Sequence, residues 1–408
     1  MAVHNSRIFE GVKVLDLTWV GVGPLTVKYL ADHGATVVHV ESSKRPDVLR
    51  LGAPYKDGVP GINRSSFYAD YNTSKLGLGV DMAHPKGKAI IEELARWADV
   101  VAEAFTPKAL KNLGLTYEHL REINPSIVMI STCMQGQTGP HANYPGFGNM
   151  MAPLCGFYEL TGYPDTGPMP PYGAYTDFVC QRFAASALIA ALDYRDRTGQ
   201  GQYIDAAQFE MALNFMGPLL LDYFANDRVA TRQGNKSPWA APHDNYPCKE
   251  PDTWCAIAVE TEEQWAALKR KMGCPTWAER PEFATFAQRK AHEAELDELM
   301  AAWTRGFTDE ELFYLLQPEV PAGPTWNVAE LYEDPQIRFN EYFTTVEHQE
   351  TGPTPYTGIE FKIDDIPVGL RWAAPTLGQH TSDILRDILH KSDDEIADLF
   401  AEEVVETT

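Results

Sequence analysis

The amino-acid sequence predicts an α/β protein whose large domain is a doubly wound parallel sheet, accompanied by a smaller α/β domain. Two observations predict this class. Short β-branched apolar runs alternate with segments in which apolar residues recur at helical spacing, and the first such run leads through a glycine-rich turn into an amphipathic helix. Alternation of strands and helices along a chain is typical of a parallel, doubly wound sheet.

The opening of the chain predicts a strand, a helix and a second strand. Residues 11–18 (GVKVLDLT) form a β-branched apolar run, which indicates a buried strand, and residues 36–41 (TVVHVE) form another. Between them, Pro24 suits the first turn of a helix, because an amide hydrogen missing there breaks no intrahelical bond.

The following segments repeat the helix-then-strand order. Residues 85–105 (PKGKAIIEELARWADVVAEAF) predict a helix that runs into a short strand, and so do residues 117–134 (YEHLREINPSIVMISTCM). Between these segments, Thr106 and Pro107 predict the N-cap and the first position of another helix.

Two long helices are expected next, at residues 177–195 and 203–227. The polar stretch after them contains glycine and proline and indicates a crossing segment. A short strand and several helices then predict a small domain at 229–327. Residues 1–228 and 328–408 would together form a discontinuous large domain.

Charge and composition exclude several classes of partner. The chain has 408 residues and a net charge of −23. A surface this acidic repels phosphate backbones and anionic lipid, so we expect no nucleic-acid and no membrane partner. An anionic ligand would have to be captured by local basic residues or by helix N-termini.

The cysteines and the N-terminal residues indicate a cytoplasmic protein. Six cysteines are scattered without a C-x-x-C pair, which is typical of reduced, buried thiols in a cytosolic chain. The first residues contain no apolar signal core, and no apolar run approaches the length of a membrane span. No metal-ligand spacing such as H-E-x-x-H is present, so no metal site is expected.

The turn after the first strand is a candidate ligand site. Residues 20–25 (VGVGPL), with Glu41 twenty residues after Gly21, partly match the dinucleotide-binding fingerprint. The match fails at the third glycine, which is Thr26 here, and Pro24 removes one amide from the helix N-terminus. We interpret the segment as a tight turn that touches a nucleotide-bearing ligand, with NAD binding as a weaker alternative.

Three further residues have an ordinary and a functional interpretation. Lys75 is either a surface lysine beside a turn or a phosphate contact, and Phe105 either packs in the core or stacks on a base. Asp177 begins the expected helix within PYGAYTDFVCQR, where an N-cap is the ordinary role of an aspartate. The tyrosines and glycines before Asp177 favour a second hypothesis, a nucleophile in an aromatic setting. Composition leaves both open.

Together these pieces resemble the class III CoA-transferase family, the carnitine and formyl-CoA transferase group. The order and spacing of the family's blocks are kept nearly from end to end. The matching blocks are GVKVLDLT, VGPL, YLADHGATVVHVE, NTSKLGLGVDM, DVVAEAF, ALKNLGL, INPSIVMIS, GQTGP, YTDF and RTGQGQYIDAAQFE. The resemblance implies a Rossmann-like large domain and an interlocked dimer in which the domains of opposite chains frame the cleft.

The resemblance also implies a mechanism and a set of contacts. Asp177 in YTDF would attack an acyl-CoA thioester, giving a mixed anhydride and then an aspartyl-CoA thioester. A CoA thioester is then a co-substrate, and no tightly bound cofactor is implied. The residues that would contact CoA are Val20, Gly21, Val22, Lys75, Ala104 and Phe105, with Lys44 and Arg45 as partners of the 3′-phosphate.

Two departures from the family pattern bear on the substrate. Gly21 replaces the glutamine of formyl-CoA-type members, which speaks against oxalate or formate and predicts room for a larger group. Gly146-Phe147-Gly148 stands where the racemase branch has a G-H-D segment. Phenylalanine cannot move an α-proton, so racemase activity is disfavoured.

We therefore expect a CoA-transferase that moves CoA from an acyl-CoA, succinyl-CoA by resemblance, to a carboxylic acid such as benzylsuccinate. It would act as a homodimer, or as a heterodimer or heterotetramer with a related subunit. Three alternatives are kept: an acyl-CoA racemase or isomerase of the same fold, a non-catalytic subunit of a CoA-transferase, and, more remotely, a nicotinamide enzyme.

Overall fold

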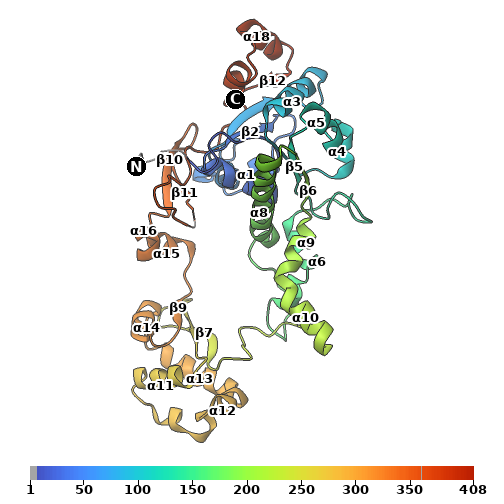
Figure 1. Cartoon of the computed structure of the whole chain (residues 1–408). Coiled ribbons are helices and arrows are strands. Elements are labelled where there is room, and N and C mark those ends of the chain that lie inside the picture. The colour runs from blue at the N-terminus through green and yellow to red at the C-terminus, as the bar shows by residue number, and fades with distance from the viewer. Residues whose placement is uncertain (1–6, 360) are drawn as a thin grey trace. The chain divides into compact units, whose positions relative to one another are not determined.

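The computed structural model describes residues 7–359 and 361–408, and the chain divides into two compact units (Figure 1). The large unit is formed by the chain up to Tyr158 together with Pro170–Ala230 and Glu341–Thr408. The small unit is formed by Glu159–Met169 and Thr231–Asn340. The domain limits expected from the sequence, with a small domain at 229–327, remain a prediction.

A seven-stranded sheet forms the centre of the large unit. Its strands are β1 (Lys13–Leu17), β2 (Thr36–Glu41), β3 (Leu76–Val80), β4 (Val100–Glu103), β5 (Val128–Ser131), β6 (Tyr203–Asp205) and β12 (Val405–Glu406). They lie in the order β12-β3-β2-β1-β4-β5-β6; β1 to β6 are parallel, and β12 pairs with β3 in the antiparallel sense. The order reverses at β1, so the predicted doubly wound sheet is confirmed.

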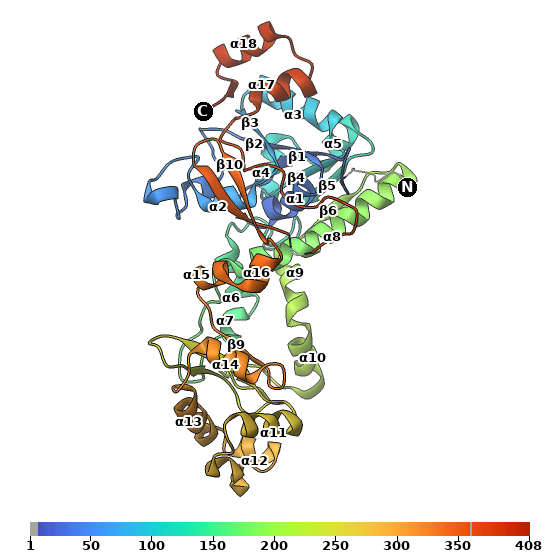
Figure 2. The same cartoon turned by 90° about the vertical axis from the view of Figure 1, so that its left-hand side faces the viewer.

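Helices cover both faces of this sheet (Figure 2). One face packs against α3 (Pro85–Trp97), α4 (Pro107–Leu113), α5 (Tyr117–Ile123) and α18 (Asp393–Ala401), and the other against α1 (Val22–Asp32), α6 (Gly148–Leu154), α8 (Tyr175–Thr198) and α9 (Gln208–Leu213). Successive strand residues point to opposite faces: Leu15 belongs to the first core and Val14 to the second. Burial on both faces explains why the strands read as continuous apolar runs.

The large unit also contains smaller elements. They are the hairpin β10 (Phe343–His348) and β11 (Gly352–Thr357), the helices α2 (Ser66–Tyr71), α10 (Gly217–Asn226) and α17 (Thr381–Asp383), the short 3-10 helices η1 (Val48–Leu51), η2 (Lys56–Gly58) and η3 (Asn214–Met216), and the π-helix η6 (Ile384–Ile388). The helix α7 (Phe157–Leu160) spans the junction between the two units.

The elements predicted early in the chain are confirmed, and one later element is wrong. The first two strands, and the helix at 177–195, which is part of α8, agree with the structure. The helix expected at 203–227 is instead β6, followed by α9, η3 and α10. Tyr203 and Ile204 pair with Met129 and Ile130 of β5, and this long-range pairing outweighs the local pattern.

The small unit has its own sheet and core. Its elements are β7 (His243–Pro247), β8 (Trp254–Ala258), β9 (Ala322–Pro324), α11 (Glu262–Lys271), η4 (Thr276–Glu279), η5 (Pro281–Phe283), α12 (Phe286–Ala291), α13 (Glu293–Thr304), α14 (Asp309–Leu316), α15 (Val328–Glu333) and α16 (Pro335–Phe339). The three strands form an antiparallel sheet in the order β7-β8-β9. Its apolar core includes Tyr246, Leu268 and Phe283.

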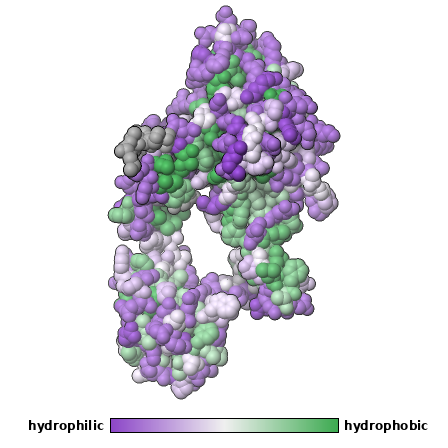
Figure 3. Space-filling model, in the orientation of Figure 1, coloured by the Kyte–Doolittle hydropathy of each residue, from purple (hydrophilic) through white to green (hydrophobic). Residues whose placement is uncertain are grey.

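Surface features bear on what the protein contacts. Polar residues cover much of the face seen in Figure 3, and an apolar patch lies over α10, where Leu221 and Phe224 are 68% and 79% exposed. Within residues 7–359 and 361–408, no helix combines the length and the apolar character that a membrane span requires. Five cysteines are buried as expected, whereas Cys274 is exposed, so the expectation of buried thiols is wrong there.

Candidate active site

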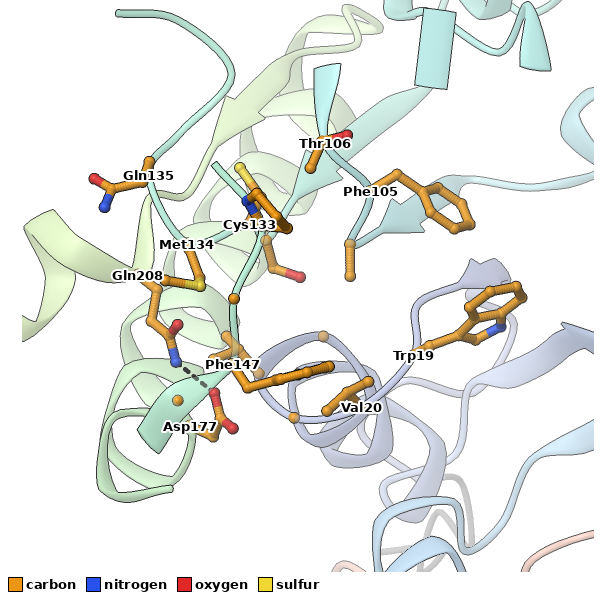
Figure 4. A pocket seen from close by; sticks show the side chains of 18 of the residues that line it. Trp19, Val20, Phe105, Thr106, Cys133, Met134, Gln135, Phe147, Asp177 and Gln208 are labelled. Carbon is orange, nitrogen blue, oxygen red and sulfur yellow. Dashed lines mark hydrogen bonds between the residues drawn. The ribbon is translucent and has the colours of Figure 1, made fainter. Parts of the chain in front are cut away.

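A cavity of about 270 Å³ opens at the carboxyl ends of the central strands of the large unit. Its walls come from the loop after β1, the loop after β4, the loop after β5, the segment 142–148, and the first residues of α8 and α9 (Figure 4). β1 and β4 are the adjacent strands at which the strand order reverses, and ligands of open α/β sheets bind at such a point. The cavity is therefore the candidate active site.

Asp177 points into this cavity from the first turn of α8. The N-cap of α8 is Ala174, and Asp177 lies three positions after it, so the N-cap interpretation of Asp177 is wrong. Its carboxylate accepts a hydrogen bond from the Gln208 amide, which also donates to the Thr176 hydroxyl at 3.1 Å. Asp177 is only 8% exposed, so it is a nearly buried carboxylate in a ligand-sized space.

Burial sets the acidity of this carboxylate. Loss of solvent raises the pKa of Asp177 to about 6, while the hydrogen bonds from Gln208 and from the backbone of Gly148 lower it in part. The donors that oppose the shift are neutral. Asp177 is therefore ionised at neutral pH but poorly solvated, which is the state of a reactive carboxylate.

Two glycines press against the Asp177 carboxylate. A Cβ atom on Gly21 would overlap the carboxylate, and one on Gly148 would lie 2.6 Å from its Oδ2 atom. Any side chain at either position would displace Asp177. The expectation that Gly21 opens room for a larger substrate is therefore wrong: the nucleophile candidate itself fills the space beside Gly21.

The loop after β1 is held in an unusual conformation. Val20 has a φ of 71°, in the left-handed region that β-branched residues avoid. Trp19 anchors the loop on one side, because its indole Nε1 donates to the Val40 carbonyl at 3.1 Å and its ring meets Phe105 edge to face at 5.4 Å. Trp19 and Phe105 thus join the loops after β1 and β4 into one wall.

The structure brings together six of the nine residues predicted for the site. The cavity is lined by Asp177, Val20, Gly21, Val22, Ala104 and Phe105. The remaining three, Lys44, Arg45 and Lys75, do not line it.

Lys75 does not agree with its predicted role as a phosphate contact. It is fully buried, and its ammonium donates to Asp16 Oδ2 at 2.9 Å, to Asn72 Oδ1 at 2.8 Å and to the Pro24 carbonyl at 3.1 Å. These acceptors use its three hydrogens inside the protein. The interpretation of Lys75 as a surface lysine is equally wrong.

Lys44 and Arg45 lie elsewhere on the same edge of the sheet. They follow the carboxyl end of β2 and are exposed, and Lys44 forms an ion pair with Asp81 at 3.0 Å. Their predicted contact with the 3′-phosphate of CoA stays a prediction.

The sequence did not identify Gln208, the partner of Asp177. Gln208 is buried and begins α9, inside the segment that was expected to be one long helix. A buried glutamine at a helix start carries no local pattern that marks a ligand site. The nearest signal in the sequence is the block RTGQGQYIDAAQFE, which contains Gln208 and matches the CoA-transferase family, but the match assigns no role to Gln208.

The fold and the cavity define an α/β enzyme with a buried carboxylate at the switch point of its sheet, and comparison with known proteins gives the family. The model of CoA-transferase family III matches residues 9–381. The chain belongs to this family. It is a class III CoA-transferase, and a CoA thioester is its co-substrate.

Relatives match over nearly the whole chain. Succinyl-CoA–D-citramalate CoA-transferase of Chloroflexus aurantiacus is 32% identical, covering 98% of both chains. Succinate–glutarate CoA-transferase of Agrobacterium fabrum is 30% identical, over 93% of this chain and 95% of its own. The crystal structure of a CaiB/BaiF family protein from Brucella suis superposes with a TM-score of 0.85 at 29% identity, covering 94% of this chain and all of the other.

Proposed function

We propose that this protein transfers CoA from succinyl-CoA to a second carboxylic acid, with Asp177 as the covalent nucleophile. The observation that carries the proposal is the Asp177 carboxylate, which lies nearly buried in the cavity at the switch point of the sheet. A carboxylate in that position is accessible to a thioester that enters the cavity and is protected from bulk water.

The names of the relatives support the donor and suggest the acceptor. Both transferases described above carry a succinyl or succinate group in their names, and their partners are citramalate and glutarate. These partners are aliphatic dicarboxylic acids, and the aryl-substituted succinate expected from the sequence finds no support among them. We therefore propose an aliphatic dicarboxylate of similar size as the acceptor.

The chemistry proceeds through acyl states of similar energy. Asp177 attacks the thioester carbonyl, CoA leaves as its thiolate, and an aspartyl–succinyl anhydride remains. The thiolate then attacks the aspartyl carbonyl of the anhydride, which releases succinate and leaves an aspartyl-CoA thioester. The acceptor carboxylate attacks this thioester and expels the thiolate. Attack of the thiolate on the acceptor's carbonyl gives the new CoA thioester and restores Asp177.

The surroundings of Asp177 suit a nucleophile that must be ionised and must also leave. With a pKa of about 6 it is mostly ionised at neutral pH, yet few hydrogen bonds have to be broken before it attacks. Gln208 fixes the orientation of the carboxylate through its neutral amide. The apolar walls, Phe105 and Phe147 among them, keep water from the anhydride.

We further propose how the protein holds CoA and assembles. Val20, Val22, Ala104 and Phe105 would contact the pantetheine or adenine part of CoA, and Lys44 and Arg45 the 3′-phosphate. The exposed apolar patch of α10 supports an oligomer, the interlocked dimer that the family resemblance implies. A relative named succinyl-CoA–L-malate CoA-transferase β subunit, from Chloroflexus aurantiacus, leaves a second type of subunit open. Analytical ultracentrifugation of the purified chain measures its oligomeric state.

The experiment that tests the function combines mass spectrometry with substitution of Asp177. After incubation with succinyl-CoA, the peptide that holds Asp177 should gain the mass of CoA less water. Asp177→Ala should lose the adduct and lower kcat/KM by a thousandfold, roughly.

Asp165→Ala, an exposed carboxylate outside the cavity, is the matched control and should keep both the adduct and the rate. A D177A protein that transfers CoA at the wild-type rate would contradict the proposal. If the wild-type chain were active only in a complex with a second subunit, and D177A kept the full activity of that complex, the non-catalytic-subunit alternative would be favoured. A panel of acids then identifies the acceptor.

A further inference from the structure

The left-handed conformation of Val20 needs a cause. Such backbone angles cost free energy in a β-branched residue and persist only where the surroundings enforce them. Val20 is also a wall residue of the cavity and directly precedes Gly21, whose backbone rests against the Asp177 carboxylate. A change in the conformation of Val20 would therefore move the surface on which the nucleophile lies.

The Val20 amide is hydrogen-bonded to the side chain of Asp47. Both of its carboxylate oxygens accept a hydrogen bond from the Val20 amide at 3.2 Å. Oδ1 also accepts from the Leu49 amide at 2.9 Å, so Asp47 is the N-cap of η1, whose first residue, Val48, lines the cavity too. The Asp47 carboxylate thus joins the backbone of Val20, which lies 27 residues earlier in the sequence, to the backbone of η1.

Asp47 is itself fixed by a buried network of hydrogen bonds on the side away from the cavity. It is fully buried, and its amide donates to Glu41 Oε2 at 3.0 Å. Glu41 in turn accepts from Arg50 at 2.8 Å and from the Tyr68 hydroxyl at 2.7 Å. An anchored carboxylate places the Val20 amide with little freedom, because none of these groups can turn toward solvent.

We propose that Asp47 is a positioning residue of the CoA-transfer reaction: it fixes Val20 in its left-handed conformation and so sets the wall that supports Asp177. Asp47 does not line the cavity and need not touch the substrate. The inference deepens the proposed function, since it rests on Asp177 as the nucleophile. The ordinary alternative is that Asp47 only caps η1, and the two roles can be separated by substitution.

The test is a mutant cycle on Asp47 and Val20. Asp47→Ser keeps an N-cap oxygen for η1, but its side chain is one bond shorter and loses the Val20 amide. Val20→Gly removes the side chain that makes the left-handed conformation costly, so that the loop no longer needs the Asp47 carboxylate to keep this conformation. Asp47→Asn is the conservative control, because its amide oxygen can still accept from Val20.

Three quantities are measured for the wild type, D47S, V20G, D47S/V20G and D47N. They are kcat/KM for CoA transfer, the affinity for free CoA by calorimetry, and hydrogen exchange of the amides at residues 19–22. We expect D47S to lower kcat/KM ten- to a hundredfold, roughly, and to speed the exchange. In the V20G background the same substitution should cost less than about threefold, and D47N should stay near the wild type.

Each result decides the proposal. A D47S protein with wild-type kcat/KM and exchange overturns it, and so does a loss that is equally large with and without V20G. A D47S protein that no longer melts cooperatively also overturns it, because the fold and not the loop would then depend on Asp47. If the wild type binds CoA but does not transfer it, the proposed function fails. The CoA affinity and the amide exchange of D47S, compared with those of the wild type, then still test the role of Asp47.

Discussion

Asp16 and Asp177 are both buried carboxylates of the large unit, and their surroundings are opposite. Asp16 lies at the end of β1, where its Oδ2 atom meets the Lys75 ammonium and His39 Nδ1, each at 2.9 Å. Burial alone would raise the pKa of Asp16, but these two cations lower it well below its ordinary value. Asp177 meets neutral donors, and burial raises its pKa to about 6.

The difference agrees with a structural role for Asp16 and with the nucleophile that we propose at Asp177. A charge neutralised by Lys75 and His39 is stable where it is and has little tendency to attack a thioester. A charge held only by an amide and a backbone N–H stays accessible, at a cost to folding. The same residue type thus has opposite pKa shifts in one unit, and the neighbouring groups set the direction of each shift. Four predictions test this contrast.

The largest effect is expected at Asp16. Asp16→Asn leaves the buried Lys75 without its anion and takes from His39 one of its two carboxylate partners, which should lower the free energy of unfolding by about 3 to 5 kcal/mol. Denaturant unfolding at neutral pH measures it. The paired variant Asp16→Asn/Lys75→Met should recover part of the loss. Equal stability of D16N and the wild type would show that the cluster is not a tight ionic network.

The same chemical change at Asp177 should have the opposite sign. Because the pKa of Asp177 is raised in the folded state, its charged form destabilises the fold above the ordinary pKa of an aspartate. Asp177→Asn should therefore raise the free energy of unfolding by about 2 kcal/mol at pH 7.5. The gain should shrink as the pH falls through 6 and vanish below the ordinary pKa of 3.8, where both states hold the proton. A destabilised D177N at pH 7.5 would contradict the contrast.

A smaller effect is expected at Gln208. Its hydrogen bond lowers the pKa of Asp177, so Gln208→Leu should move the acid limb of the kcat/KM profile from near pH 6 to a higher pH. The loss of activity relative to the wild type should then be several-fold larger at pH 6 than at pH 8.5, where the Asp177 carboxylate is ionised in both proteins. Gln208→Glu, which adds a like charge, should shift the limb further in the same direction. An unmoved limb would mean that another group sets the profile.

The smallest effect belongs to the exposed pair after β2. The Lys44–Asp81 ion pair is open to solvent, so Lys44→Ala together with Arg45→Ala should leave the free energy of unfolding close to that of the wild type. If the two residues bind the 3′-phosphate, KM for the CoA donor rises a few-fold. The corresponding donor made with dephospho-CoA should show no change between wild type and variant. An equal rise in KM with both donors would show that Lys44 and Arg45 do not bind the 3′-phosphate.

Much of the fold could be predicted because its signals are local. The strands β1 and β2 have both faces buried, so each reads as an apolar run bounded by turns. β6 has three residues and is fixed by pairing with β5, which lies more than seventy residues earlier. A pattern that covers a few residues cannot report such a partner.

The site was predictable where residues follow strands, and not where distant side chains meet. Val20 and Phe105 come directly after β1 and β4, so the topology alone brings them to one edge. Lys75 was misassigned because its anion, Asp16, is 59 residues away. Gln208 was missed for the same reason, since its contact with Asp177 spans 31 residues.

The division of the large unit over three chain segments has a consequence for biosynthesis. β12 pairs with β3, yet the whole of the Thr231–Asn340 segment is translated between them. A nascent chain therefore carries β3 as an unpaired sheet edge while the ribosome synthesises most of the small unit. The speed of translation through that insertion sets how long the edge is available to other molecules in the crowded cell.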